Sequence, residues 1–131
     1  MKFQKGIIVF GVIEICIGMF MFCDTFLYML AGKPARPPEV VTFILATSLI
    51  STGLGIGVLR YHIHSYHLLL FFSSVIILSK ILIFGHIISL NDALQAQFPF
   101  TLRNLTSILY HGILIGYFIN PAVKKRFKET A

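Results

Sequence analysis

Four long runs of apolar residues, separated by short polar segments, dominate the chain. They cover residues 6–30, 40–60, 68–90 and 105–120. Apolar side chains occupy consecutive positions within each run, whereas the strands of a membrane β-barrel alternate apolar and polar residues. Because a backbone in hydrocarbon must satisfy its own hydrogen bonds, consecutive apolar positions predict helices. We therefore predict an all-α, integral membrane four-helix transmembrane bundle with up-down-up-down topology.

The polar segments between the runs contain residues that end helices. Three prolines lie within Gly32–Pro38, and Pro121 follows the fourth run. Residues 61–67 are predicted to form a short loop, and residues 91–104 form the longest connection. The fourth run is about 22 Å long as a helix, slightly short for a ~30 Å hydrocarbon core. We predict a single transmembrane domain over residues 1–131, with a short basic tail at 121–131.

Composition and charge agree with a membrane location. Apolar residues make up 56% of the chain and charged residues 12%, about half the charged share of a soluble domain. The net charge of +6 comes from Lys and Arg residues that lie mostly at the ends of the apolar runs. This placement anchors and orients membrane helices. It argues against nucleic acid as a partner.

The distribution of basic residues also predicts the orientation of the helices. Seven Lys and Arg residues lie on the side of both termini: Lys2, Lys5, Arg60, Lys124, Lys125, Arg126 and Lys128. Three lie on the other side: Lys33, Arg36 and Arg103. The positive-inside rule therefore predicts that both termini are cytoplasmic. Lys124, Lys125, Arg126 and Lys128 are also candidates for contact with anionic lipid headgroups, although their role could be limited to fixing the topology.

Ionisable residues inside the runs are the strongest functional signal, because a charge in hydrocarbon needs a partner. At 1.5 Å per residue, Glu14, His111 and Lys80 lie roughly 12, 14 and 18 Å from the cytoplasmic ends of their helices. This inner layer is either a structural ion pair of Glu14 and Lys80 with His111 beside it, or a proton or ion relay. Asp24 and His86 form an outer pair at ~27 Å.

Histidines raise the question of a metal or haem cofactor. His62, His64 and His67 are possible metal ligands, but their spacing matches no specific zinc signature and they equally suit an interfacial loop. Haem would need two histidines at a common depth, and His86 and His111 differ by ~13 Å. We therefore predict no cofactor.

Small residues indicate where helices pack closely, since lipid tails provide no hydrophobic force between helices. Three pairs of glycines share helix faces in the first, second and fourth runs: Gly11 and Gly18, Gly53 and Gly57, and Gly112 and Gly116. Their partners are either helices of this chain or helices of another subunit.

Two segments resemble small bacterial four-helix membrane proteins of uncharacterised function. The aromatic end of the fourth run continues into Pro121-Ala-Val-Lys-Lys-Arg-Phe127, which is similar to a Pro-x-Val-Lys-x-x-Phe tail in those proteins. The segment Gly11-Val-Ile-Glu14-Ile-x-x-Gly18 in the first run also resembles the first helix of those proteins. The resemblance implies a bacterial cytoplasmic (inner) membrane protein and no particular activity.

Motifs of soluble catalysis are missing from the sequence, which has no Gly-x-Ser-x-Gly, no His-Glu-x-x-His and no phosphate-binding glycine loop. We assign no catalytic residue. The leading hypothesis is a non-enzymatic accessory or structural subunit whose partners are the lipid bilayer and other membrane subunits or copies of itself. The alternative is a small transporter, or an ion- or proton-conducting oligomer, that uses Glu14, Lys80 and His111.

Overall fold

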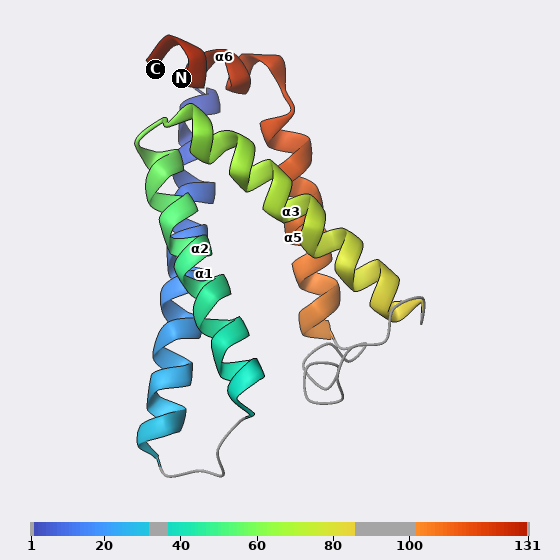
Figure 1. The fold of residues 1–131 in the computed structure, drawn as a ribbon. Helices are drawn as coiled ribbons and strands as arrows, with labels where there is room; N and C mark the ends of the chain where they lie inside the picture. Colours follow the sequence, from blue (N-terminus) through green and yellow to red (C-terminus); the bar gives the residue numbers. More distant parts are fainter. Residues whose placement is uncertain (1, 32–36, 86–101, 131) are drawn as a thin grey trace.

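The computed structural model describes residues 2–31, 37–85 and 102–130, and these residues are helical apart from short turns. Five helices occur in them: α1 (Lys2–Leu30), α2 (Pro38–Leu59), α3 (Ile63–Phe84), α5 (Leu102–Phe118) and α6 (Pro121–Thr130). The all-α prediction is confirmed for this part of the chain. The N-terminus, the α2–α3 turn and α6 lie at the same end of the molecule (Figure 1).

Three of the helices, over Gln4–Leu30, Pro38–Leu59 and Ile63–Leu82, are long and apolar enough to cross a membrane. Large apolar side chains remain exposed along them, including Phe20 at 72% and Leu27 at 63% exposure. Soluble monomers rarely expose extended apolar surface. The fourth predicted span corresponds to α5, which has 17 residues and is about 26 Å long.

The helix boundaries differ from the prediction at α3 and α6. The segment 61–67 is not wholly a loop, because α3 begins at Ile63. The basic tail is a helix, because Asn120 supplies an N-terminal cap: its Oδ1 accepts a hydrogen bond of 3.0 Å from the Ala122 N–H. Pro121 at the first helical position has no N–H to satisfy and is well suited to start a helix there.

The turn between α2 and α3 is a Schellman motif. The His62 N–H donates to the Gly57 carbonyl at 2.9 Å, and the Tyr61 N–H donates to the Val58 carbonyl at 3.0 Å. Tyr61 occupies the left-handed position usually taken by glycine, with φ 57°, at a cost of about 1–2 kcal/mol. Its ring packs against Phe127 of α6 with the centroids 5.6 Å apart, which offsets part of that cost.

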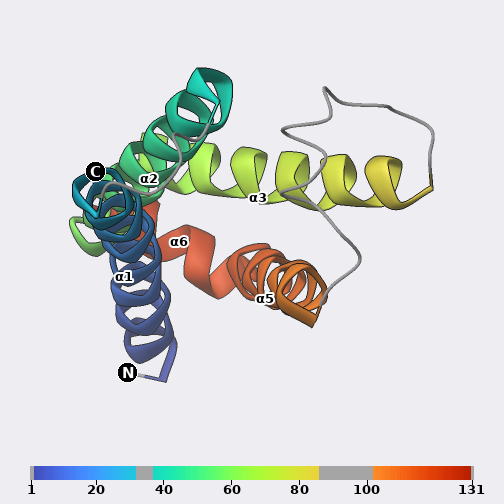
Figure 2. The same ribbon diagram turned by 90° about the horizontal axis from the view of Figure 1, so that it is seen from below.

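The helices are arranged as two pairs, and the structure does not confirm the four-helix bundle that the sequence predicted. α1 and α2 pack along their length, and α5 packs on α3. The pairs meet near the end covered by α6 and diverge toward the other end (Figure 1). Figure 2 shows α3 extending away from the α1–α2 pair. The spacing of apolar residues predicts which segments are helical, but it contains no information about the angle at which they cross.

The main core lies where the two pairs meet beneath α6. It joins side chains from all five helices: Ile7, Leu54, Val58, Tyr66, Leu69, Leu114, Phe118, Val123 and Phe127. The Tyr66 hydroxyl donates a 2.9 Å hydrogen bond to the carbonyl of Phe118, in the last turn of α5. α6 therefore closes the core with Val123 and Phe127 rather than remaining a solvated tail.

Candidate functional site

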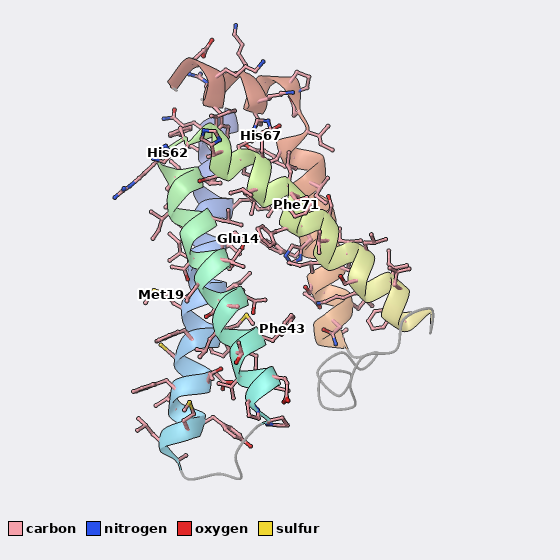
Figure 3. All side chains as sticks on the ribbon, in the orientation of Figure 1. Glu14, Met19, Phe43, His62, His67 and Phe71 are labelled. Carbon is pink, nitrogen blue, oxygen red and sulfur yellow. The ribbon has the colours of Figure 1, made fainter. Side chains whose placement is uncertain are left out.

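The carboxylate of Glu14 lies where three helices meet. Its side chain on α1 is only 4% exposed. Oε2 accepts a 2.5 Å hydrogen bond from the Ser51 hydroxyl of α2, and Oε1 accepts a 2.9 Å hydrogen bond from the Tyr110 hydroxyl of α5. In Figure 3, Glu14 lies on the side of the α1–α2 pair that faces the other two long helices. One carboxylate thus links both helix pairs.

Glycine spacing on α1 explains how Glu14 reaches this position. Gly11, Glu14 and Gly18 share one side of the helix, because residues three and four apart lie close together. Gly11 contacts the Gly55 carbonyl and Leu59, and Gly18 contacts Ser48 and Thr52. These contacts bring α1 against α2, so that the Ser51 hydroxyl also lies 3.0 Å from the backbone oxygen of Glu14.

Lys80 and His111 lie within electrostatic range of the same site. Lys80 on α3 is buried, with 7% exposure. His111 Nδ1 lies 2.7 Å from the Ser107 carbonyl, and because a carbonyl only accepts, this nitrogen carries a hydrogen. The charges of Glu14 and Lys80 both act on His111. The structure thus brings the three residues of the predicted inner layer near one another. Whether they form an ion pair or a relay stays a prediction.

Sequence reasoning missed Ser51 and Tyr110 as the hydrogen-bonding partners of Glu14. The sequence prediction paired Glu14 with charged residues, whereas the carboxylate is bound by hydroxyls. A usable signal existed: on the depth scale used above, Ser51 and Tyr110 lie at roughly 13 and 15 Å, close to Glu14 at ~12 Å. Hydroxyl residues at matching depths would have been the candidates.

The outer polar pair is only half described by the structure. Asp24 is exposed on α1. His86 lies outside the described residues, so its pairing with Asp24 stays a prediction.

The three histidines near the α2–α3 turn, His62, His64 and His67, are exposed. His67 donates from Nδ1 to the Ile63 carbonyl of its own helix at 3.0 Å. In residues 2–31, 37–85 and 102–130, no three His, Cys, Asp or Glu side chains are grouped so that they could hold a metal ion. Metal binding by His62, His64 and His67 stays a prediction. The start of α3 at Ile63 separates His62 from the two helical histidines.

The predicted glycine faces fall into two groups. Gly11 and Gly18 pack against α2, and Gly57 packs against Ser65 in the first turn of α3. Among the described residues, no atom of another segment lies within 4 Å of a Cβ added at Gly53, Gly112 or Gly116. The α2 glycine that approaches α1 is Gly55, and a shared packing face of Gly53 and Gly57 stays a prediction.

The cations of α6 are exposed while its apolar residues are buried. Val123 and Phe127 face the core, and Lys124, Lys125, Arg126 and Lys128 are exposed. Lys125 pairs with Glu129 at 3.5 Å. Exposed pairs of this kind contribute little stability. α6 is therefore attached by its apolar side, which leaves its basic side available for contact.

Comparison with known protein families, with curated proteins and with solved structures finds no match for this chain. The resemblance to small bacterial four-helix membrane proteins therefore stays a prediction. Conclusions about function depend on the geometry of the Glu14 site and on the surfaces that the helices leave open.

Proposed function

We propose that the chain is an integral membrane protein with four spans, α1, α2, α3 and α5, and that both termini are cytoplasmic. The exposed apolar side chains of the long helices support this placement. Basic residues gather at the end that bears α6, where Lys5 and Arg60 are exposed together with the cations of α6. In this orientation α6 lies along the cytoplasmic surface, with its basic side near lipid headgroups.

Within the membrane, the chain acts as a non-enzymatic accessory subunit that packs laterally against other helices. The observation that carries this proposal is the open face of α5. Within the part of the chain that the structure describes, no atom of another segment lies within 4 Å of the position where a Cβ would project from Gly112 or Gly116. Glycines four residues apart allow the backbone of a second helix to approach closely. The two helix pairs also diverge toward the end away from α6 (Figure 1).

Gentle detergent extraction at native expression, followed by mass analysis of what co-purifies, tests the accessory role. We expect a stoichiometric set of other membrane subunits with the unmodified chain. Gly112→Leu should release them by blocking close approach. Ala46→Leu is the control, because it enlarges an exposed small residue on α2. A chain that purifies alone as a monomer would overturn the proposal.

A second candidate is a small transporter or a proton-conducting oligomer, and the Glu14 site favours it. A carboxylate buried at mid-depth and bound by hydroxyls from two other helices is the kind of group that marks ion and proton pathways in membranes. Reconstitution into liposomes tests this function. Glu14→Gln should abolish flux while the helix content is retained. Equal flux with and without the carboxylate would exclude this role for Glu14.

A further inference from the structure

The Ser51 hydroxyl is positioned to hydrogen-bond with Glu14 in two different ways. Its oxygen lies 2.5 Å from Glu14 Oε2 and 3.0 Å from the backbone oxygen of Glu14. Both of those oxygens accept hydrogen bonds, but a serine hydroxyl carries a single hydrogen to donate. One hydrogen cannot make two full hydrogen bonds. An ionised Glu14 has to share this hydrogen between its two oxygens in a three-centre bond, whereas a protonated Glu14 gives each contact a hydrogen of its own.

Counting hydrogens shows that the same heavy-atom positions suit both charge states of the carboxyl group. When Glu14 is ionised, Ser51 donates to Oε2 and Tyr110 donates to Oε1. When Glu14 is neutral, its Oε2–H donates to the Ser51 oxygen, and the Ser51 hydrogen turns to the Glu14 backbone oxygen. Tyr110 continues to donate to Oε1, which is then the carbonyl oxygen. Only hydroxyl hydrogens move between the two states.

We propose that Glu14 is a reversible proton-binding site in which the Ser51 hydroxyl switches acceptors. One proton from water adds to Oε2, the charge changes from −1 to 0, and no covalent bond between heavy atoms forms or breaks. Both states keep every polar atom of the carboxyl group hydrogen-bonded, which is the requirement for a buried polar group. Exchange between the states therefore costs little rearrangement.

The charged and titratable groups around Glu14 come from the helices packed against it. α5 presents Tyr110 and His111, and α3 contributes the positive charge of Lys80, which acts on His111 together with Glu14. α2 presents the neutral hydroxyl of Ser51. The site requires neither a partner subunit nor a transported solute, so it extends beyond the proposed accessory role.

Infrared difference spectroscopy between low and high pH, on the purified full chain in lipid nanodiscs, tests the proposal directly. The chain has five Asp and Glu residues, so the carboxylic acid C=O band of Glu14 is identified by its loss in Glu14→Gln. We expect a pH-dependent band that disappears in this variant. Glu14→Asp keeps a carboxyl group and should shift the band, which provides a second test if Glu14→Gln fails to fold.

Ser51→Ala tests the switching hydroxyl. It should shift the frequency of the Glu14 band, because it removes the acceptor of the Oε2–H bond. Ser74→Ala is the matched control, since the Ser74 hydroxyl bonds the Leu70 carbonyl of its own helix and should leave the band unchanged. Identical carboxylic acid spectra for the unmodified chain and Glu14→Gln at every pH would overturn the proton site. A band unaffected by Ser51→Ala would overturn the switch.

Discussion

Replacing Gly55 with alanine tests the α1–α2 contact that positions Glu14. A Cβ at this position would lie 2.7 Å from the Gly11 carbonyl oxygen, 2.7 Å from Ile15 Cγ1 and 2.9 Å from the Ile15 nitrogen. Two of these three atoms belong to the α1 backbone. A side-chain rotation therefore cannot relieve the overlap, and the helices must separate.

Two opposing effects determine how much unfolding free energy Gly55→Ala should lose. Overpacking a close contact costs about 1–3 kcal/mol, while alanine favours a helix interior over glycine by about 1 kcal/mol. Gly112→Ala is the matched control, because no atom of another described segment lies within 4 Å of its added Cβ. The gain in helix propensity from glycine to alanine is common to both variants, so it cancels when their stabilities are compared. The difference in stability between them should therefore be about 1–3 kcal/mol, with Gly55→Ala the less stable.

Reversible unfolding in mixed micelles with rising SDS content, followed by circular dichroism, measures this difference. The measurement should use monomeric chain, so that lateral contacts at Gly112 do not contribute. Equal unfolding free energies for Gly55→Ala and Gly112→Ala would refute the described contact between the two backbones. Glu14 would then need another explanation for its burial.

Three further predictions concern α6 and the core beneath it. Phe127→Ala should cost about 3–5 kcal/mol of unfolding free energy, because Phe127 is fully buried; an unchanged unfolding curve would contradict its place in the core. Asn120→Ala should weaken the start of α6 by about 0.5–2 kcal/mol, seen as faster trypsin cleavage within α6, and unchanged cleavage would speak against the cap. Tyr66→Phe removes the hydrogen bond to the Phe118 carbonyl and should cost about 1 kcal/mol in the same SDS titration, whereas a neutral result would show that the bond contributes nothing.

The positions of the long helices could be predicted from sequence because each helix is a continuous apolar run. α6 could not be predicted in the same way, since Pro121 and four basic residues suggested an exposed tail. The signal that identifies it is local: Asn120 and Pro121 form a helix start, and Val123 and Phe127 are four residues apart on one face. Its stability depends on tertiary contacts that no local pattern contains.

The candidate site was predictable in part. Gly11 and Gly18 correctly indicated that Glu14 faces another helix, because close backbone contact requires small residues there. Matching depth could have made Ser51 and Tyr110 candidates for binding the carboxylate, but serine and tyrosine are common and carry no charge that demands a partner, so sequence alone could not have selected them. The divergence of the helix pairs was also beyond sequence pattern, because it depends on the packing of side chains between distant segments.

The sequence separations of the two Glu14 hydrogen bonds have a consequence for biogenesis. Ser51 lies 37 residues from Glu14, and Tyr110 lies 96 residues away. If the chain is inserted as proposed, α2 reaches the bilayer well before α5, and the α1–α2 hairpin can close on its glycine contacts while the rest of the chain is still being translated. On the proposed membrane placement, Ser51 shields the carboxyl group from lipid in this interval. Tyr110 then docks the later helix pair onto a site that is already half assembled.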